Sequence, residues 1–409
     1  MNITFLKLYI TDELNSSFYN SQEIGLAKAV TEVYPEHRVN IVLLSRGEGR
    51  VEKITDKVTL HVMKAKGVGH HGMLRRGVAG EPDNEENLGL DLIKELKTDV
   101  LHLLADNMLY APNVIRYCRK NGIKYHLYIG TLFTDSNKWY RKALDRLMMS
   151  RNIAEYRRSP VYVKTPGVQR QCQELGIKAE LAPVGLNKED VVLSERPVEE
   201  IRGQYGIPAD KKVLLFVGRL EEYKHPLDAV EALRMLNVKG AKASAENTDH
   251  VDGSTKYHLV VVGKGALEDA LKAMTTEYSL TESVTLLPKV PNTEMKHLYK
   301  ACDYFVNFNP DEIYGMSILE AMAHKCLVLA INAPGPDFLI KDGETGYLCE
   351  SVEAMTQRIR KIAQKSEAGQ QTNPETDWSD VTSNARDYVS AHLTWDKLVY
   401  SFKDFSEMP

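Results

Sequence analysis

Short apolar runs rich in β-branched residues alternate with amphipathic helical stretches over nearly the whole chain. This alternation is typical of parallel sheets whose two faces are covered by helices. A first series of expected strands ends before a polar stretch at 194–210, and a second series begins after it. The expected strands are 3–10, 40–44, 59–62, 100–104, 125–129 and 160–163, then 213–217, 259–262, 284–287, 304–308 and 327–331. The pattern predicts an α/β fold with two doubly wound domains of similar size.

The composition is that of an ordinary soluble protein. Of 409 residues, 43% are hydrophobic and 26% charged, and 52 Lys and Arg against 56 Asp and Glu give a net charge of −4. Because there is no basic excess, nucleic acid is not expected as a partner. Five Cys without any C-x-x-C pair argue against a disulfide framework and against a structural metal. The first residues do not resemble a signal peptide, and no run of 18 apolar residues occurs, so we expect a cytoplasmic protein.

The most informative stretch is 309–331, which reads NPDEIYGMSILEAMAHKCLVLAI. An expected strand leads into a loop with Glu312 and Gly315, and the helix expected at 316–324 carries Glu320 about one turn from its start. Doubly wound proteins bind ligands at the carboxyl ends of their strands, where a helix N-terminus favours an anion. Carboxylate oxygens accept hydrogen bonds from hydroxyls. The stretch therefore predicts a ligand with diols beside a phosphate, as in a nucleotide sugar. The alternative is two solvated glutamates.

Cationic residues follow the strand expected at 213–217. Gly218 and Arg219 come directly after this strand, and Lys224 lies five residues further on, before a helix that begins near 226. An Arg binds phosphate oxygens with two N–H groups, whereas a Lys acts as a point charge. Because this strand end is expected at the same crevice, the two cations predict a site that stabilises a departing diphosphate. The alternative is a pair of solvated surface cations.

A third loop, 288–293 (PKVPNT), follows the strand expected at 284–287. By the same topology it lies at the same edge of the sheet. The backbone near Val290 is therefore a candidate contact for a nucleobase.

The second half resembles the carboxyl-terminal domain of family 4 glycosyltransferases of the GT-B fold. The resemblance covers roughly 211–349 and is carried by FVGRLEEYKHPLDAVEAL, LPKVPNTEMKHLYKACDYFV, DEIYGMSILEAMAHKCLVLA and DGETGYLC, in that order. Glu312 and Glu320 reproduce the Glu-x7-Glu spacing of that family. The resemblance implies a retaining transfer of a sugar from a nucleotide diphosphate sugar, without a bound metal or a cofactor. It also implies two Rossmann-like domains that face a cleft, which we place at 1–195 and 196–385, and a terminal helix at 386–409 that packs back on the first domain.

The resemblance also implies roles for single residues. Arg219 and Lys224 would hold the diphosphate, Glu312 would bind a hydroxyl of the donor sugar, and Glu320 would bind the ribose hydroxyls. The remaining donor-binding residues would be Gly218, Val290 at the base, and the amides of Gly315, Met316 and Ser317. A uridine nucleotide is the expected donor, and the expected acceptor is a glycan or a lipid-linked molecule.

The first half departs from the family pattern. Asn20 and Ser21 stand near the position of a glycine pair that many members have, and Gly130 stands where members often have a His. The residue that contacts the acceptor therefore stays open. Basic and apolar residues are interleaved over 138–158. That stretch predicts either a helix at the inner face of an anionic membrane or an ordinary amphipathic helix on the sheet.

Other functions fit the sequence less well. Gly263 and Gly265 follow a strand, but Glu268 stands at the third glycine position of G-x-G-x-x-G, which disfavours a nicotinamide or flavin enzyme. The adjacent His70 and His71 favour a glycine-rich loop over a metal site, because neighbouring residues do not share a face in regular structure. Two alternatives stay open, a sugar-nucleotide epimerase and a non-catalytic partner subunit of a transferase.

Overall fold

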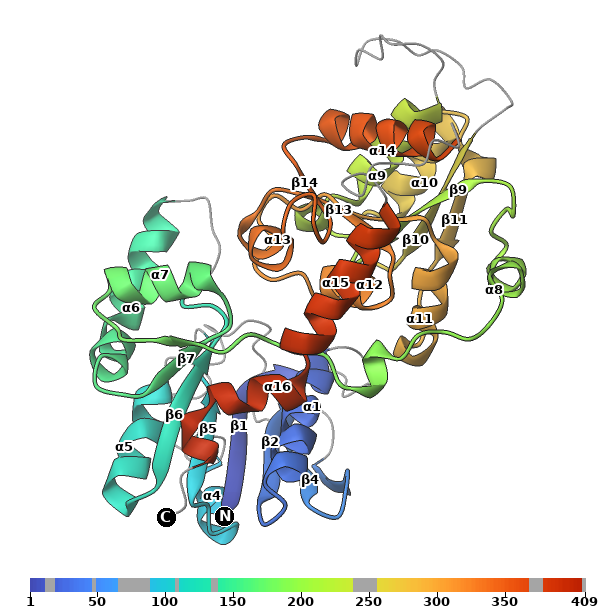
Figure 1. The fold of residues 1–409 in the computed structure, drawn as a ribbon. Coiled ribbons are helices and arrows are strands. Elements are labelled where there is room, and N and C mark those ends of the chain that lie inside the picture. The colour runs from blue at the N-terminus through green and yellow to red at the C-terminus, as the bar shows by residue number, and fades with distance from the viewer. Residues whose placement is uncertain are drawn as a thin grey trace. The chain divides into compact units, whose positions relative to one another are not determined.

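The computed structural model describes residues 1–11, 19–45, 49–64, 89–106, 110–133, 139–237, 256–367 and 378–406. Contacts divide the chain into two compact units, one of residues 1–187 with 393–409 and one of residues 188–392 (Figure 1). The sequence analysis placed these boundaries at 195/196 and 385/386. The second unit is longer at both ends because its terminal segments contact each other. In one such contact, a guanidinium N–H of Arg386 donates to the carbonyl of Val191 over 2.8 Å.

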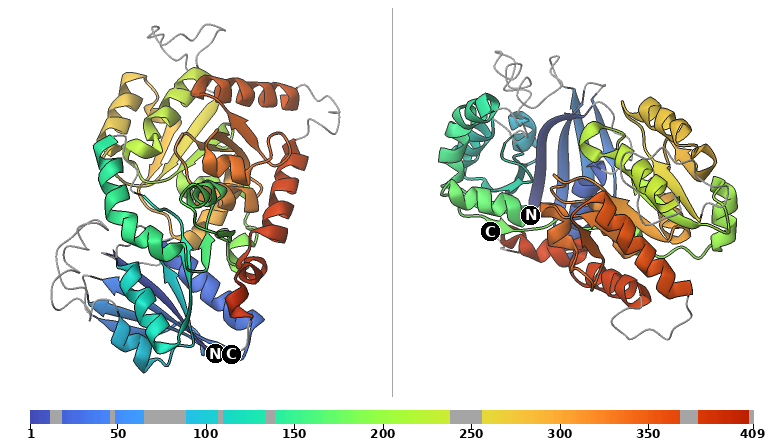
Figure 2. Two further views of the ribbon diagram at one scale, coloured as in Figure 1. Left: turned by 90° about the vertical axis from the view of Figure 1, so that its left-hand side faces the viewer. Right: turned by 90° about the horizontal axis from the view of Figure 1, so that it is seen from above.

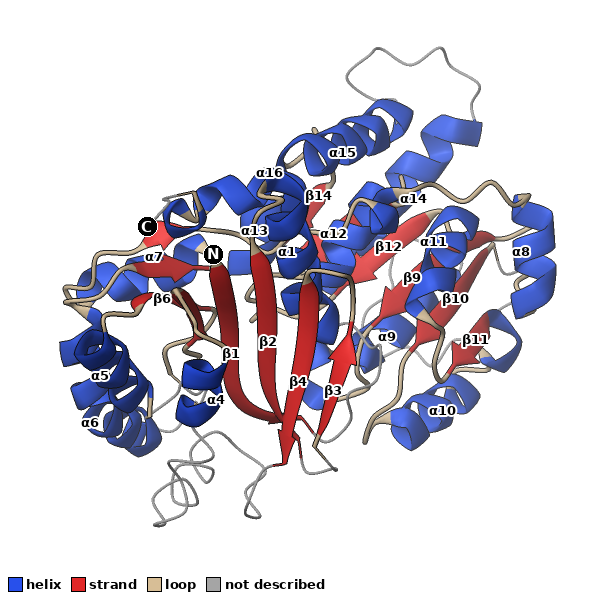
Figure 3. Cartoon of the chain, turned by 90° about the horizontal axis from the view of Figure 1, so that it is seen from below, coloured by secondary structure: helices blue, strands red, loops and turns tan. Residues whose placement is uncertain are grey.

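The described strands of the first unit form one eight-stranded sheet with the order β3-β4-β2-β1-β5-β6-β7-β8. All neighbouring strands are parallel except the edge pair β3 and β4 (Figure 3). The strands are β1 (Asn2–Thr11), β2 (Arg38–Ser45), β3 (Arg50–Lys53), β4 (Val58–Lys64), β5 (Val100–Leu104), β6 (Lys124–Ile129), β7 (Val161–Val163) and β8 (Glu180–Leu181). The central strand β5 is buried at every position, as expected for a parallel strand with both faces covered.

Helices connect the strands of the first unit, and the end of the chain adds a short helix to them. They are α1 (Tyr19–Val33), α4 (Leu90–Glu95), α5 (Ala111–Asn121), α6 (Trp139–Tyr156), α7 (Pro166–Glu174) and α16 (Trp395–Leu398). The last segment is tied to this unit by a bridge between Leu186 and Thr394 and by the rings of Phe402 and Phe405, which are fully buried against the sheet. Helix α16 packs on α1.

The described strands of the second unit form a six-stranded parallel sheet with the order β11-β10-β9-β12-β13-β14. The strands are β9 (Lys212–Val217), β10 (Tyr257–Val262), β11 (Val284–Leu287), β12 (Tyr304–Asn307), β13 (Leu327–Ile331) and β14 (Tyr347–Cys349). After β9 the chain adds β10 and β11 on one side and then returns to place β12 on the other side. The strand order therefore reverses between β9 and β12, which is where doubly wound folds bind ligands.

Helices lie on both faces of this sheet as well (Figure 2). They are α8 (Val198–Tyr205), α9 (Pro226–Asn237), α10 (Glu268–Glu277), α11 (Asn292–Ala301), α12 (Met316–Ala323), α13 (Pro334–Leu339), α14 (Val352–Glu367) and α15 (Trp378–His392). One hydrophobic cluster joins side chains of β9, β10, β12 and β13 to the apolar faces of α9 and α14. Every residue of β10, β12 and β13 is buried, so both faces of the central strands are covered.

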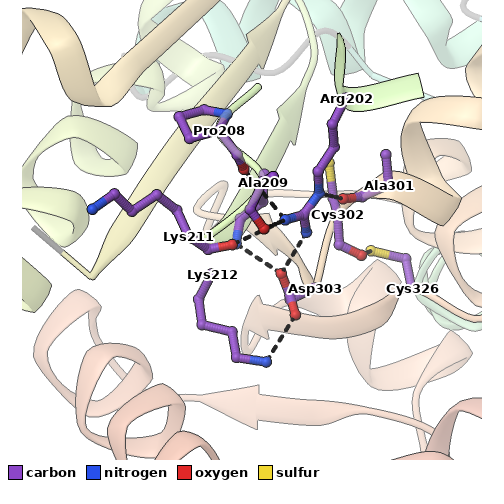
Figure 4. A network of polar contacts seen from close by, with 10 residues as sticks. Arg202, Pro208, Ala209, Lys211, Lys212, Ala301, Cys302, Asp303 and Cys326 are labelled. Atoms are coloured by element: carbon purple, nitrogen blue, oxygen red, sulfur yellow. Dashed lines mark hydrogen bonds and ion pairs between the residues drawn. The ribbon is translucent and has the colours of Figure 1, made fainter. Parts of the chain in front are cut away.

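A polar network holds α8 against the amino ends of β9 and β12 (Figure 4). Arg202 forms an ion pair with Asp303 over 3.1 Å, and Lys212 pairs with the other oxygen of the same carboxylate over 3.1 Å. The remaining N–H groups of Arg202 donate to the backbone carbonyls of Pro208, Ala209, Lys211 and Ala301. This network lies away from the carboxyl ends of the strands, so we assign it to folding.

Several elements differ from the sequence expectations, and among them the short strands β8 and β14 were not expected. The edge strand β3 was not expected, because its residues, RVEK, are all exposed and show no apolar alternation. The single terminal helix expected at 386–409 is instead interrupted between α15 and α16. Thr394 takes an extended conformation there, which allows its bridge to Leu186.

Several sequence predictions fall outside the described residues. These are the histidine pair at 70 and 71, and Lys138 at the start of the basic stretch. In the part of the chain that the structure does describe, no helix is long and apolar enough to cross a membrane. The same residues contain no cluster of His, Cys, Asp or Glu that is able to hold a metal ion.

Candidate functional site

The predicted site residues follow neighbouring strands of the second sheet. Gly218 and Arg219 come after β9, and the loop with Glu312 comes after β12, at the point where the strand order reverses. Strands β9 and β12 pair in parallel through Leu214 and Tyr304, so their carboxyl ends point to the same edge. The fold thus brings together residues that are far apart in the sequence.

Lys224 and Glu312 form an ion pair at this edge. The ammonium of Lys224 donates to Oε2 of Glu312 over 2.6 Å, and the side-chain amide of Asn309 donates to the same oxygen over 3.3 Å. Glu312 is only 8% exposed, whereas Lys224 retains more contact with solvent. The sequence analysis assigned Lys224 and Glu312 to different parts of a ligand, but in the unliganded structure they neutralise each other. Asn309 was not predicted, and no sequence signal distinguished it from an ordinary loop residue.

Arg219 supplies a more exposed cation at the same edge. Its guanidinium lies over the Tyr223 ring, 5.3 Å from the ring centre, and the ammonium of Lys224 lies 5.5 Å from that centre. A cation above an aromatic face keeps its N–H groups available for other acceptors. Among the described residues, Arg219 has no carboxylate within ion-pair distance. Its charge is therefore free to attract an anion, unlike that of Lys224.

The loops after β9 and β10 are bound closely to each other. The amide of Gly218 donates to the carbonyl of Val262, and the amide of Leu220 donates to the carbonyl of Lys264. A Cβ atom at Gly263 would overlap the Gly218 carbonyl, so a glycine is required there. This contact is a structural reason for a glycine that the sequence analysis weighed only as part of a dinucleotide motif. The interlocked loops hold Arg219 in place and bring the exposed Lys264 to the same edge of the sheet.

The N-terminus of α12 provides backbone donors beside these side chains. Gly315 begins the helix in the left-handed region with a φ of 90°, and no side chain caps the first amides. Met316 and Ser317 are both partly exposed. The loop before α12 is supported from behind, because the amide of Gly335 donates to the carbonyl of Glu312 over 2.7 Å. The arrangement offers amides and a helix dipole to an anion.

Glu320 lies in the second turn of α12, about 6 Å along the helix axis from its start. Its Oε2 accepts a 2.7 Å hydrogen bond from the hydroxyl of Tyr299, a buried residue of α11. Burial raises the pKa of Glu320 to about 7, although the Tyr299 hydrogen bond opposes that rise. Tyr299 was not predicted to belong to the site, since its position in an amphipathic helix reads as ordinary core.

Val290 lies in the loop between β11 and α11 and is partly exposed. Its strand is two positions away from β9 in the sheet order. The loop is therefore at the carboxyl edge of the sheet, as predicted. Among the described residues, no hydrogen bond joins Val290 to the other site residues.

The corresponding edge of the first sheet carries a different set of groups. Asp106, after β5, accepts hydrogen bonds from the amides of Gly130 and Thr131, and its other oxygen pairs with Lys164 over 3.2 Å. A Cβ atom at Gly130 would lie 2.7 Å from Cδ of Lys164. The Lys164 side chain thus fills the space into which a longer side chain at position 130 would extend.

Comparison with known proteins relates the second unit to a family. Residues 197–376 match the family described as Glycosyl transferases group 1. The second unit is therefore similar to the domain of group 1 glycosyltransferases. The matched residues include the Arg219, Lys224, Glu312 and Glu320 positions, and the family resemblance noted from the sequence is confirmed.

Two curated relatives show how far the similarity extends. The chain is 26% identical over 161 residues to a D-inositol 3-phosphate glycosyltransferase of Corynebacterium glutamicum, which covers 38% of this chain and 36% of that protein. It is 30% identical over 177 residues to the human alpha-1,3/1,6-mannosyltransferase ALG2, which covers 40% of each chain. The chain thus matches well under half of the length of these relatives.

Solved structures with the same fold extend over both units. Sucrose-phosphate synthase from Thermosynechococcus elongatus covers 99% of this chain and 98% of its own, with a TM-score of 0.74 and 17% identity. The Anabaena protein HepE, in complex with UDP and glucose, covers 99% and 98%, with a TM-score of 0.68 and 16% identity. WaaG, a glycosyltransferase involved in lipopolysaccharide biosynthesis, covers 99% of each chain with a TM-score of 0.68 and 16% identity. The predicted GT-B fold with its two parallel-sheet units is confirmed.

Proposed function

We propose that this protein is a glycosyltransferase that takes a sugar from a UDP-linked donor and transfers it with retention of configuration. The observation that carries the proposal is the set of groups at the reversal point of the second sheet. That edge joins the free cation of Arg219, the Lys224–Glu312 pair and the uncapped amides of α12, within a unit similar to the domain of group 1 glycosyltransferases.

Each of these groups binds a different part of the donor. The exposed guanidinium of Arg219 and the amides of Met316 and Ser317 bind the diphosphate, because both kinds of donor favour phosphate oxygens. Glu320 accepts hydrogen bonds from the ribose hydroxyls. The backbone of Val290 contacts the base, and the backbone of Gly218 also contacts the donor.

The Lys224–Glu312 pair suggests how the site responds to its ligand. A diphosphate competes with Glu312 for the ammonium of Lys224, and a sugar hydroxyl then donates to the released carboxylate oxygen. Negative charge grows on the diphosphate as the bond to the sugar breaks. Lys224, Arg219 and the amides stabilise that charge, and each such donor is worth about 3 to 4 kcal/mol in the transition state.

We propose that the acceptor attacks the sugar on the same face from which the diphosphate departs, so that the anomeric configuration is retained. No side chain near the assigned sugar position is required as a covalent nucleophile. We assign no metal and no cofactor to the reaction, since fixed cations and amides perform the charge stabilisation that a metal would otherwise supply. A measurement of turnover in the presence of a chelator tests this part of the proposal.

Similar proteins support the choice of substrates. The neighbour HepE binds UDP and glucose, which supports uridine in the donor. The relatives are named as transferases to an inositol phosphate and as a mannosyltransferase, and WaaG acts in lipopolysaccharide biosynthesis. We therefore propose a glycan or a lipid-linked acceptor.

A membrane contact through 138–158 is proposed on its exposed residues. The described part of α6 exposes Arg146, Leu147 and Arg151, with Leu147 71% exposed, while Ile153 and Tyr156 are buried on the sheet. Basic residues around an exposed leucine favour an anionic lipid surface. Sedimentation with anionic vesicles tests this contact, and an unchanged distribution for Leu147→Glu would contradict it.

The proposed activity is tested by the release of UDP from UDP-linked sugars. We expect slow release from one donor by the wild-type protein and roughly 100-fold slower release by Arg219→Ala. This variant is preferable to Lys224→Ala, because the loss of Lys224 also leaves Glu312 buried without its counter-charge. Lys272→Ala removes an exposed cation of another Lys–Glu pair in the same unit and is the matched control.

Two outcomes contradict the proposal in different ways. Normal turnover in Arg219→Ala rejects the role of that residue while leaving the activity in place. A wild-type protein that binds no nucleotide sugar favours the alternative of a non-catalytic partner subunit, which keeps the fold without the reaction.

A further inference from the structure

Tyr299 connects the proposed ribose-binding carboxylate to the interior of the second unit. The Tyr299 side chain is 1% exposed, and its hydroxyl donates to Oε2 of Glu320 over 2.7 Å. Its ring is stacked on His324, with ring centres 5.7 Å apart and planes at 9°, and lies 6.1 Å from the ring of Phe305. These contacts fix the hydroxyl on one oxygen of Glu320. Among the described residues, no hydrogen bond is formed with the other carboxylate oxygen.

The charge of Glu320 decides whether it is able to bind a diol. An ionised carboxylate accepts hydrogen bonds from two hydroxyls, whereas a protonated one has lost part of that capacity. Burial raises the pKa of Glu320 to about 7, the Tyr299 hydrogen bond lowers it, and the negative charge of Asp190 raises it. Both forms are therefore populated near neutral pH.

The charged and titratable groups near this part of α12 come from four segments. Asp190 is an exposed residue of the short helical turn at 189–191, Tyr299 belongs to α11, His324 is the residue that follows α12, and Arg386 belongs to α15. Arg386 donates to the carbonyls of Ala323 and Val191, so its guanidinium is held by the backbone.

Two of these neighbours keep a constant charge between pH 5.5 and 8.5. Burial lowers the pKa of His324 to about 4, which leaves its ring neutral through this range. Burial and the adjacent Glu320 raise the pKa of Tyr299 well above its ordinary value, which leaves its hydroxyl protonated. A titration between these limits therefore reports mainly on Glu320.

We propose that Tyr299 is a positioning residue, whose hydroxyl holds the Glu320 carboxylate in the form that binds a ribose diol. The nucleotide affinity of the site then depends on pH near neutrality. This inference rests on the proposed function, since it assumes that Glu320 contacts the ribose.

The test compares the binding of UDP and of 2′,3′-dideoxy-UDP by calorimetry from pH 5.5 to 8.5. The ratio of the two dissociation constants isolates the contact with the ribose hydroxyls, because titration of the phosphates affects both ligands alike. In the wild-type protein we expect the preference for UDP to rise about tenfold through a midpoint near pH 7. Glu320→Gln removes the titrating group. In this variant we expect the preference for UDP over 2′,3′-dideoxy-UDP to be lower than in the wild type and independent of pH.

One variant then tests the inference itself. Tyr299→Phe keeps the stacked ring and removes the hydroxyl, so the midpoint should move about one pH unit upward. Tyr278→Phe is a control for the loss of a tyrosine hydroxyl in the same unit, and its midpoint should not move. Circular dichroism checks that each variant is folded.

The outcomes separate this inference from the proposed function. If the wild-type protein binds neither nucleotide, the proposed function fails. If it binds both equally at every pH, the assignment of Glu320 to the ribose fails. If the wild-type ratio titrates but Tyr299→Phe keeps the same midpoint, the proposed function stands and the positioning role is overturned.

Discussion

Replacing Glu320 by Gln should stabilise the second unit at alkaline pH while it weakens nucleotide binding. In the wild-type protein this carboxyl is forced to ionise in buried surroundings, which raises its pKa from the ordinary 4.5 to about 7. Between these two values the folded state holds a proton that the unfolded state releases. The stability of the wild-type protein therefore falls as the pH rises from about 4.5 to 7 and is constant above that range.

The size of this effect follows from the two pKa values. A difference of about 2.5 pH units corresponds to about 3 kcal/mol at 1.36 kcal/mol per unit. Because Glu320 keeps partial contact with solvent, we expect a gain of about 2 to 3 kcal/mol for Glu320→Gln at pH 8. The Gln carbonyl still accepts the hydrogen bond from Tyr299. For a unit of this length the gain corresponds to about 4 to 10 °C in melting temperature.

Urea denaturation between pH 5 and 8.5 measures this difference. We expect the stabilities of the two proteins to be similar near pH 5, to diverge as the pH rises from about 5 to 7, and to differ by a constant amount above pH 7. Glu268→Gln is a control of the opposite sign, because Lys272 lowers the pKa of that exposed carboxyl. Parallel curves for wild type and Glu320→Gln over the whole range would refute the reasoning, since they would mean that burial does not oppose the ionisation of Glu320.

Two further predictions concern the scaffold of the second unit. Arg202→Met removes the guanidinium shared by Asp303 and four backbone carbonyls, while Lys212 still pairs with Asp303, so it should lower the free energy of unfolding by about 2 to 4 kcal/mol in urea titrations. UDP affinity should be unchanged in the folded protein, and loss of affinity without loss of stability would contradict this. Arg196→Met removes the more exposed ion pair with Glu200 and should lower the free energy of unfolding by less than about 1 kcal/mol. Gly263→Ala forces the Gly218 carbonyl to move, so it should lower the free energy of unfolding by about 1 to 3 kcal/mol and weaken UDP binding. An affinity for UDP equal to that of the wild type would count against the role of these interlocked loops.

The fold was largely predictable because parallel strands leave a strong pattern. Runs such as 100–104, 284–287 and 327–331 match their strands at both ends, since each is mostly apolar or β-branched. The edge strand β3 leaves no such pattern, because its RVEK side chains are all exposed. The interruption before α16 was also hidden. The apolar spacing continues through Thr394, but its backbone is extended to pair with Leu186.

The sequence predicted which residues of the candidate site lie at one edge of the sheet, but not how their side chains are paired. The rule that ligands bind where the strand order reverses correctly places Arg219 and the Glu312 loop at one edge. It does not predict which side chains pair with each other. The contact of Lys224 with Glu312 joins residues 88 positions apart, and the geometry of two loops decides it.

The sequence did not predict Tyr299 as a site residue, for a different reason. In the sequence of α11 it occupies an apolar position, and nothing distinguishes it from a core aromatic. Its proposed positioning role depends on a single hydroxyl that donates to Glu320 on a neighbouring helix. Periodicity reports which face of a helix is buried, but it does not report what that face touches.

A crystal structure of the protein with UDP would test the proposed donor site most directly. We expect the diphosphate at the N-terminus of α12 within hydrogen-bonding distance of Arg219, the ribose hydroxyls on Glu320, and Lys224 moved from Glu312 toward a phosphate oxygen. UDP bound elsewhere, with the Lys224–Glu312 pair intact and Arg219 in contact with solvent alone, would contradict the proposed donor site.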